Sequence, residues 1–134
     1  MIIYYLKLYI TTLVAFLTID MVWLSLMARS FYGKYLGSML SPRPIWSVAI
    51  LFYLLFVCGV LVFVVLPGLQ SGSPKIVILL GILYGLITYG TYGLTNLAII
   101  KDWPWIVTVV DICWGIILAT SVSYIGFLAG KFLS

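Results

Sequence analysis

Two aspartates inside apolar segments are the residues of this sequence best suited to chemistry. Asp20 occurs in TIDMVWL and Asp111 in VTVVDICWG, and each is followed three residues later by a tryptophan, Trp23 or Trp114. On a helix this spacing places each acid and its tryptophan on one face. An aspartate costs about 2.5 to 3.5 kcal/mol at the bilayer centre. A chain keeps one there when the carboxyl group binds, exchanges a proton or is well paired.

The stretch 84–114 supplies the other polar candidates. It holds the only asparagine of the chain, Asn96, and helical spacing puts Tyr89 and Tyr92 on the same face. An amide and two phenols on an apolar helix need hydrogen-bond partners inside a bundle. The predicted ligand-binding or proton-binding site therefore contains seven side chains: Asp20, Trp23, Tyr89, Tyr92, Asn96, Asp111 and Trp114.

The elements that must position these side chains are four membrane-spanning helices. Of the 134 residues, 65% are hydrophobic and only 7% are charged, a balance typical of a chain whose solvent is lipid. A helix needs about 20 apolar residues to cross the hydrocarbon, and four such runs occupy residues 8–28, 45–66, 76–100 and 105–128. We predict an all-α integral membrane protein, with a single transmembrane domain over residues 1–134 folded as a compact up-down bundle.

In such a bundle the first and third loops lie on one side of the membrane. Counted from that side at about 1.5 Å per residue, Asp20 and Asp111 lie roughly 9 to 12 Å deep and Asn96 roughly 6 Å deep. Three polar groups on three helices are thus expected at similar depth. The spans contain no cation. The expected partners of the acids are Arg29 and Lys101 at the interface, nearby phenols and indoles, or a proton shared between the acids.

The D-x-x-W pattern occurs twice, and we interpret it as a local aromatic wall beside each acid. The first and fourth helices run in opposite directions, and both acids lie on one side of the midplane. A pseudo-two-fold axis at the midplane therefore does not relate the two motifs.

The loops carry further structural signals. In the first loop, residues 29–44, aromatic and apolar side chains recur at helical spacing, which fits either a short interfacial helix or an ordinary loop with aromatic anchors. The third loop, KDWPW, is short enough to require an antiparallel return, and Asp102 is expected to cap the fourth helix. A slight excess of cations in the first and third loops favours an orientation with both termini outside, and a chain this close to balance could also insert in both orientations.

Composition argues against several functions. The net charge is +4, but the seven cations are scattered among short membrane loops, which fits lipid headgroups better than nucleic acid. Cys58 and Cys113 lie within spans and form no CxxC motif, so neither metal binding nor thiol redox chemistry is indicated. No cofactor motif and no nucleophile paired with a base is present, which leaves enzymatic activity undecided.

Several segments resemble a known family. The runs TYGLTNLAIIKDWPW and VTVVDICWG, together with TIDMVWL in the first span and FYGKYLG in the first loop, are similar to bacterial membrane proteins grouped as domain of unknown function 2177. The resemblance extends over nearly the whole chain. It implies a compact, multi-pass protein of the bacterial inner membrane with four helices, and it implies no particular activity.

Three functions fit these features, each with membrane lipids as partners. The first, which we favour, is an intramembrane polar site that binds or helps to modify a lipophilic molecule such as a lipid. The second is a small proton-coupled transporter acting as a homo-oligomer of two copies, since an acid in the first helix beside aromatic residues is also a feature of small multidrug transporters. The third is a structural membrane subunit that docks through the small residues Gly81, Gly85 and Gly93.

Overall fold

Four long apolar helices make up the protein in the computed structural model, which describes residues 1–134. They run Ile2–Leu36, Trp46–Ser71, Pro74–Ile99 and Trp105–Leu133, and no strand is present. Each is long enough to cross about 30 Å of hydrocarbon at about 1.5 Å per residue. The predicted all-α fold with four membrane-spanning helices is therefore confirmed, although the first and last helices are longer than expected.

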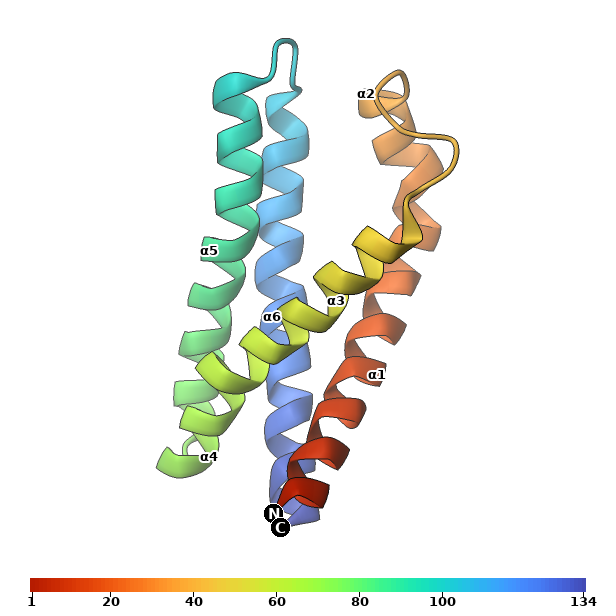
Figure 1. Ribbon diagram of the computed structural model, residues 1–134. Helices are drawn as coiled ribbons and strands as arrows, with labels where there is room; N and C mark the ends of the chain where they lie inside the picture. The colour runs from red at the N-terminus through yellow and green to blue at the C-terminus, as the bar shows by residue number, and fades with distance from the viewer.

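Two of these helices contain a π turn, which divides them into shorter elements (Figure 1). Of the two interpretations of the first loop, the structure supports a short helix, α2, but this helix continues the first one through the π turn η1. The elements in chain order are α1 (Ile2–Met27), η1 (Ala28–Tyr32), α2 (Gly33–Leu36), α3 (Trp46–Val60), η2 (Leu61–Val65), α4 (Leu66–Ser71), α5 (Pro74–Ile99) and α6 (Trp105–Leu133).

Helices α5 and α6 lie side by side along their length (Figure 1), because glycines on α5 let the two backbones approach closely. A Cβ atom on Gly81 would lie 2.9 Å from the Cα atom of Thr120, and one on Gly85 would lie 2.7 Å from the Cα atom of Ile116. The glycine face is thus covered by α6 of the same chain. The third hypothesis, in which this face contacts another protein, is wrong on that point.

The turn between α5 and α6 is held by side chains that flank it. The indole N–H of Trp103 donates to Oγ1 of Thr108 at 3.0 Å, and the Thr108 hydroxyl donates to the carbonyl of Gly93 at 3.0 Å. Pro104 is the N-cap residue of α6, and no side chain caps this helix. The predicted cap by Asp102 is therefore wrong. Asp102 instead has a φ angle of 61°, a left-handed conformation that aspartate tolerates in a turn.

Helix α3 crosses the bundle obliquely (Figure 1), and two tyrosines tie its backbone to neighbouring helices. The Tyr9 hydroxyl of α1 donates to the carbonyl of Leu54 at 2.9 Å, and the Tyr84 hydroxyl of α5 donates to the carbonyl of Phe56 at 3.0 Å. Such bonds between helices are favourable in lipid, where no water competes for the groups.

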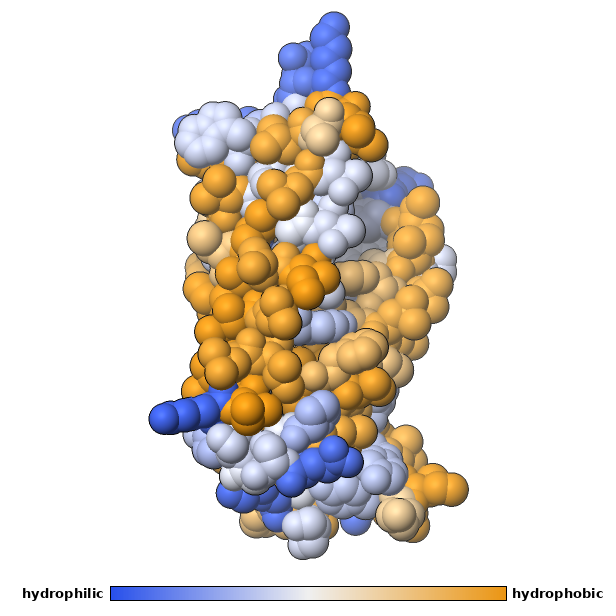
Figure 2. Space-filling model, turned by 90° about the vertical axis from the view of Figure 1, so that its left-hand side faces the viewer, coloured by the Kyte–Doolittle hydropathy of each residue, from blue (hydrophilic) through white to orange (hydrophobic).

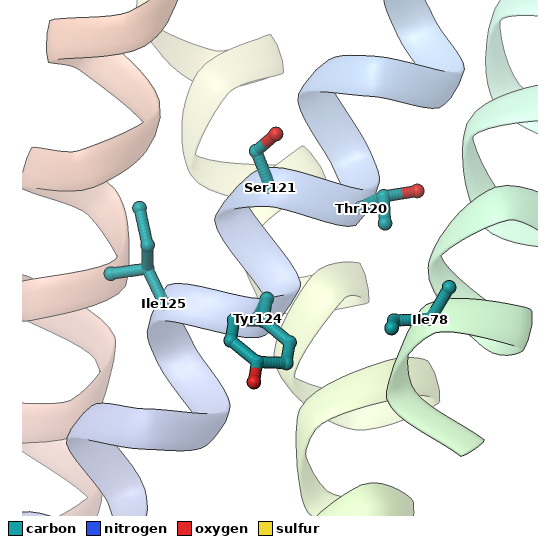
Figure 3. A pocket seen from close by; sticks show the side chains of 5 residues that line it. All are labelled: Ile78, Thr120, Ser121, Tyr124 and Ile125. Carbon is teal, nitrogen blue, oxygen red and sulfur yellow. The ribbon is translucent and has the colours of Figure 1, made fainter. Parts of the chain in front are cut away.

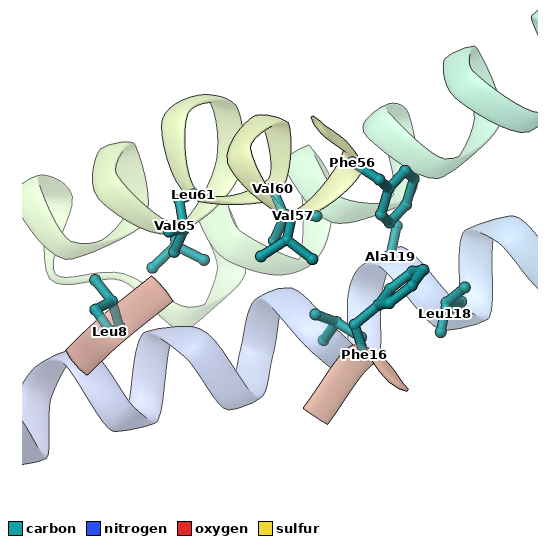
Figure 4. Packing of buried hydrophobic residues seen from close by; sticks show 10 residues of the cluster. Leu8, Phe16, Phe56, Val57, Val60, Leu61, Val65, Leu118 and Ala119 are labelled. Carbon is teal, nitrogen blue, oxygen red and sulfur yellow. The ribbon is translucent and has the colours of Figure 1, made fainter. Parts of the chain in front are cut away.

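Buried hydrophobic side chains pack together in an apolar core (Figure 4). From their positions along the helices, this core fills the middle of the bundle and the half that contains the two chain termini. A smaller cluster of Val64, Val77 and Phe127 lies beside it. The two buried aspartates belong to neither cluster and lie in the other half of the bundle, towards α2. The main core contains ten buried residues from α1, α3, η2 and α6: Leu8, Phe16, Phe56, Val57, Val60, Leu61, Val65, Leu118, Ala119 and Val122.

The exposed surface is largely apolar, as expected for a protein that lies in lipid. Figure 2 shows a broad hydrophobic band on the face it displays, with hydrophilic side chains at the two ends. Large apolar side chains are exposed on all four long helices. A soluble protein would expose such a surface only at an interface with a partner.

Candidate functional site

Asp20 of α1 and Asp111 of α6 lie on one cavity in the half of the bundle towards α2. Helices α1 and α6 pack against each other and run in opposite directions (Figure 1). Each aspartate is only 7% exposed. The structure thus brings together the two acids that loop lengths predicted to lie at similar depth.

The two aspartates are bound in a crossed arrangement by the tryptophans of the D-x-x-W motifs. The indole N–H of Trp114, on α6, donates to Oδ1 of Asp20, on α1, at 3.2 Å. The indole N–H of Trp23, on α1, donates to the hydroxyl of Tyr32 at 3.1 Å, and that hydroxyl donates to Oδ1 of Asp111, on α6. Each tryptophan is therefore connected to the acid of the opposite helix: Trp114 bonds directly to Asp20, and Trp23 is linked to Asp111 through Tyr32.

The two indoles also stack on each other. The rings of Trp23 and Trp114 are nearly parallel, at 6°, with centroids 4.3 Å apart. The repeated motif is therefore more than the local aromatic wall that we inferred from the sequence. It forms one unit across the α1–α6 contact, in which stacking and hydrogen bonds fix the positions of both carboxylates.

Tyr32 reaches this unit because of the π turn η1. It lies nine residues after Trp23, which in an ideal α-helix is about two and a half turns and puts the two side chains on opposite faces. The wider turn of η1, closed by the bond from the N–H of Gly33 to the carbonyl of Ala28, reduces this rotation. A helical wheel drawn from the sequence could not place Tyr32 at the site.

The cavity beside the two acids has a volume of about 380 Å³. This is within the usual range for a small-molecule site, about 300 to 1,000 Å³. Six of the seven predicted side chains line it, and the exception is Asn96. Leu40 of the loop after α2 and twelve residues of the four long helices line it: Asp20, Trp23, Leu24, Tyr32, Leu36, Leu40, Ala49, Phe52, Tyr53, Tyr89, Tyr92, Asp111 and Trp114.

The cavity opens sideways between α3 and α5. A neighbouring hollow of about 290 Å³ is lined by Phe52, Thr88, Tyr89 and Tyr92, three of which also line the main cavity. Phe52 is 47% exposed and Tyr92 is 53% exposed. Figure 2 looks onto this face, which is hollowed in its upper half. In a bilayer this opening would face lipid rather than water.

Tyr89 forms part of the inner wall, and its position depends on a glycine of α6. A Cβ atom on Gly115 would overlap the Tyr89 ring, at 2.5 Å from its Cδ1 atom, so only glycine leaves room for the ring. Asn96 lies one turn beyond Tyr92, towards the α5–α6 turn, and does not line the cavity. The structure therefore brings the two acids to one cavity and leaves the amide outside it.

The two carboxylates have hydrogen-bond donors but no cation as partners. Their donors are Trp114 and Tyr32. Arg29 and Lys101, the cations expected to reach down from the interface, are exposed and do not line the cavity. A proton shared between the two acids remains a prediction. The site can accept hydrogen bonds, hold a proton or attract a positive charge. The hydroxyl in it that donates to a carboxylate is the phenol of Tyr32, and no thiol lines the cavity.

A different hollow lies between α5 and α6 (Figure 3). It is open, with a volume of about 500 Å³, and is lined by Ile78, Thr120, Ser121, Tyr124 and Ile125. It has no acid or cation, which makes it unsuited to acid–base chemistry. The hydroxyls of Ser121 and Tyr124 form no hydrogen bond within the chain, whereas several other helix hydroxyls, such as that of Thr91, donate to the carbonyl four residues earlier.

Comparison with known proteins identifies a family. The family model described as predicted membrane protein (DUF2177) matches residues 5–128. No curated protein and no solved structure matches the chain. The matched range contains every residue that lines the main cavity.

Proposed function

This chain belongs to the DUF2177 family of predicted membrane proteins, and we propose that it binds, or helps to modify, a lipophilic molecule such as a lipid inside the bilayer. The observation that carries the proposal is the cavity between α1, α3, α5 and α6. It combines two buried carboxylates with a mostly apolar and aromatic wall and an opening towards lipid. A largely apolar pocket with a few convergent polar groups is the usual form of a small-molecule site.

The geometry suggests how such a molecule would lie. Its apolar part would pass between α3 and α5, beside Phe52 and Tyr92, where the cavity meets the lipid-facing surface. Its polar part would lie next to Asp20 and Asp111. In a reaction, these two side chains would serve as acid or base.

The apolar core favours this proposal over a proton-coupled transporter. Transport requires that a site open alternately to both sides of the membrane. Both acids lie towards α2, whereas the half with the chain termini is filled by the clusters around Val60 and Val64. A molecule bound at this site would enter and leave through the lateral opening.

A substitution that fills the cavity should displace bound lipid while both aspartates are kept. Ala49 lines the cavity from α3, so Ala49→Phe would occupy part of its volume. We expect lipid that co-purifies with the protein in a mild detergent to fall several-fold, measured by mass spectrometry of extracts at equal protein concentration. The matched control is Ala98→Phe, because Ala98 is exposed on α5 and outside the cavity. Equal lipid content in the two variants would contradict the proposal.

We also propose that two copies of the chain associate through the hollow of Figure 3. Ser121 and Tyr124 lie near the middle of α6, where an unpartnered hydroxyl in hydrocarbon is costly. Hydroxyls both donate and accept, so the same patch on a second copy would satisfy them.

Removing the two hydroxyls should weaken this self-association. The double variant Ser121→Ala with Tyr124→Phe is expected to shift the protein from dimer towards monomer, by several-fold in the dimer dissociation constant. Single-molecule photobleaching of labelled protein in liposomes at increasing dilution measures this shift. Thr91→Val is the control, because the Thr91 hydroxyl already donates to the carbonyl of Ile87. A monomeric wild-type protein at all dilutions would refute the association.

A further inference from the structure

The chemistry of the cavity wall indicates which polar group a bound molecule would carry. Asp20 and Asp111 each use only Oδ1 in a hydrogen bond. Neither Oδ2 atom is among the buried polar atoms sealed away without a partner. Two carboxylate oxygens, one from α1 and one from α6, are therefore reachable by a ligand, and both are acceptors.

Aromatic faces complete the surroundings of these oxygens. The stacked indoles of Trp23 and Trp114 lie beside the acids, and the rings of Tyr53, Tyr89 and Tyr92 also line the cavity. The faces of aromatic rings attract a cation within about 6 Å of the ring centre. Carboxylates among aromatic rings thus form a site suited to an ammonium group.

The same wall disfavours an anion. No lysine or arginine lines the cavity, and the chain contains no histidine. The nearby Lys34 lies over the ring of Tyr35, outside the lining. A phosphate or carboxylate headgroup would meet two negatively charged groups and no positive one.

From these three observations we infer that the site takes an amphiphile with an ammonium headgroup, whose positive charge lies between Asp20 and Asp111 and whose chain leaves between α3 and α5. This inference rests on the proposed function and narrows it to one class of ligand. The ammonium group supplies the positive charge that the protein itself does not place beside its two buried acids.

The test compares three probes with the same twelve-carbon chain: dodecyltrimethylammonium, dodecanol and dodecyl sulfate. Each is tritiated, and binding to the purified protein in a neutral maltoside detergent is measured by gel filtration on a column equilibrated with the probe. We expect dodecyltrimethylammonium to bind at least about tenfold more tightly than either of the other probes.

Replacement of the two acids should remove this preference. Asn keeps an oxygen that can accept the bonds from Trp114 and Tyr32, so Asp20→Asn with Asp111→Asn should leave the cavity intact. Unchanged binding of dodecanol would verify that. The single variant Asp20→Asn should lose part of the preference, which keeps the test valid if the double variant fails to fold. Asp102→Asn, in an exposed turn, is the control and should keep the full preference.

The outcomes separate this inference from the proposed function. Equal binding of all three probes, lost in Ala49→Phe, would support a lipophilic site and overturn the ammonium inference. An ammonium preference that survives replacement of both acids would also overturn it. Absence of saturable binding by any probe would refute the proposed function together with the inference.

Discussion

Gly85→Ala is expected to destabilise the protein by about 1 to 3 kcal/mol, the usual cost of overpacking a tight contact. The new Cβ atom would lie 2.7 Å from Cα of Ile116 and 2.8 Å from the carbonyl carbon of Gly115. Both atoms belong to the backbone of α6, so no side-chain rotation can relieve the contact. The two helices would have to separate, and Tyr89, one turn further along α5, would move with them.

Gly90 offers a matched control on the same helix. A Cβ atom there would meet only Cδ1 of Leu94, at 3.9 Å. Because alanine is the better helix former, Gly90→Ala is expected to be neutral or to stabilise by up to about 1 kcal/mol. Reversible unfolding in mixed micelles with increasing SDS, followed by circular dichroism, measures both variants. Equal stabilities would mean that the α5–α6 contact is looser than the structure has it.

Tyr32→Phe is expected to cost about 1.5 to 3 kcal/mol, because it removes a hydrogen bond to a charged group. The change leaves two polar groups without their partner, the carboxylate of Asp111 and the indole N–H of Trp23. Tyr35→Phe is the control, since the hydroxyl of Tyr35, three residues later, forms no hydrogen bond in the chain. The same unfolding measurement should show a change near zero for Tyr35→Phe.

A double-mutant cycle tests whether the loss belongs to the bond with Asp111. Combining Tyr32→Phe with Asp111→Leu should destabilise by less than the sum of the two single changes, with a coupling energy of about 1 kcal/mol or more. Strict additivity would show that Tyr32 contributes through packing alone.

Much of the site followed from the sequence because membrane helices obey simple geometry. Rise per residue and loop order were enough to predict that Asp20 and Asp111 lie near one depth. Helical periodicity also placed Trp23 and Trp114 beside an acid. These four residues form the crossed unit that the structure contains.

Two kinds of feature could not be predicted: departures from ideal α-helical geometry, and helix packing that leaves no periodic pattern in the sequence. Tyr32 was assigned to the first loop because the apolar run ends at residue 28, whereas the first helix continues through the π turn η1, which changes the rotation along it. The oblique path of α3 had no signal, since this span is apolar on every side. Asn96 was expected at the site from depth and face alone, yet its position one turn beyond Tyr92 leaves it outside the cavity.

The continuous first helix, Ile2–Leu36, has a consequence for the bilayer itself. Its 35 residues span about 50 Å at about 1.5 Å per residue, against hydrocarbon about 30 Å thick. Such a mismatch is accommodated by tilting, or by a local change in bilayer thickness. Where the bilayer changes its thickness, lipids beside the protein differ in height from those farther away. Selection of a ligand would depend on how deep its headgroup sits as well as on the charge that the headgroup carries.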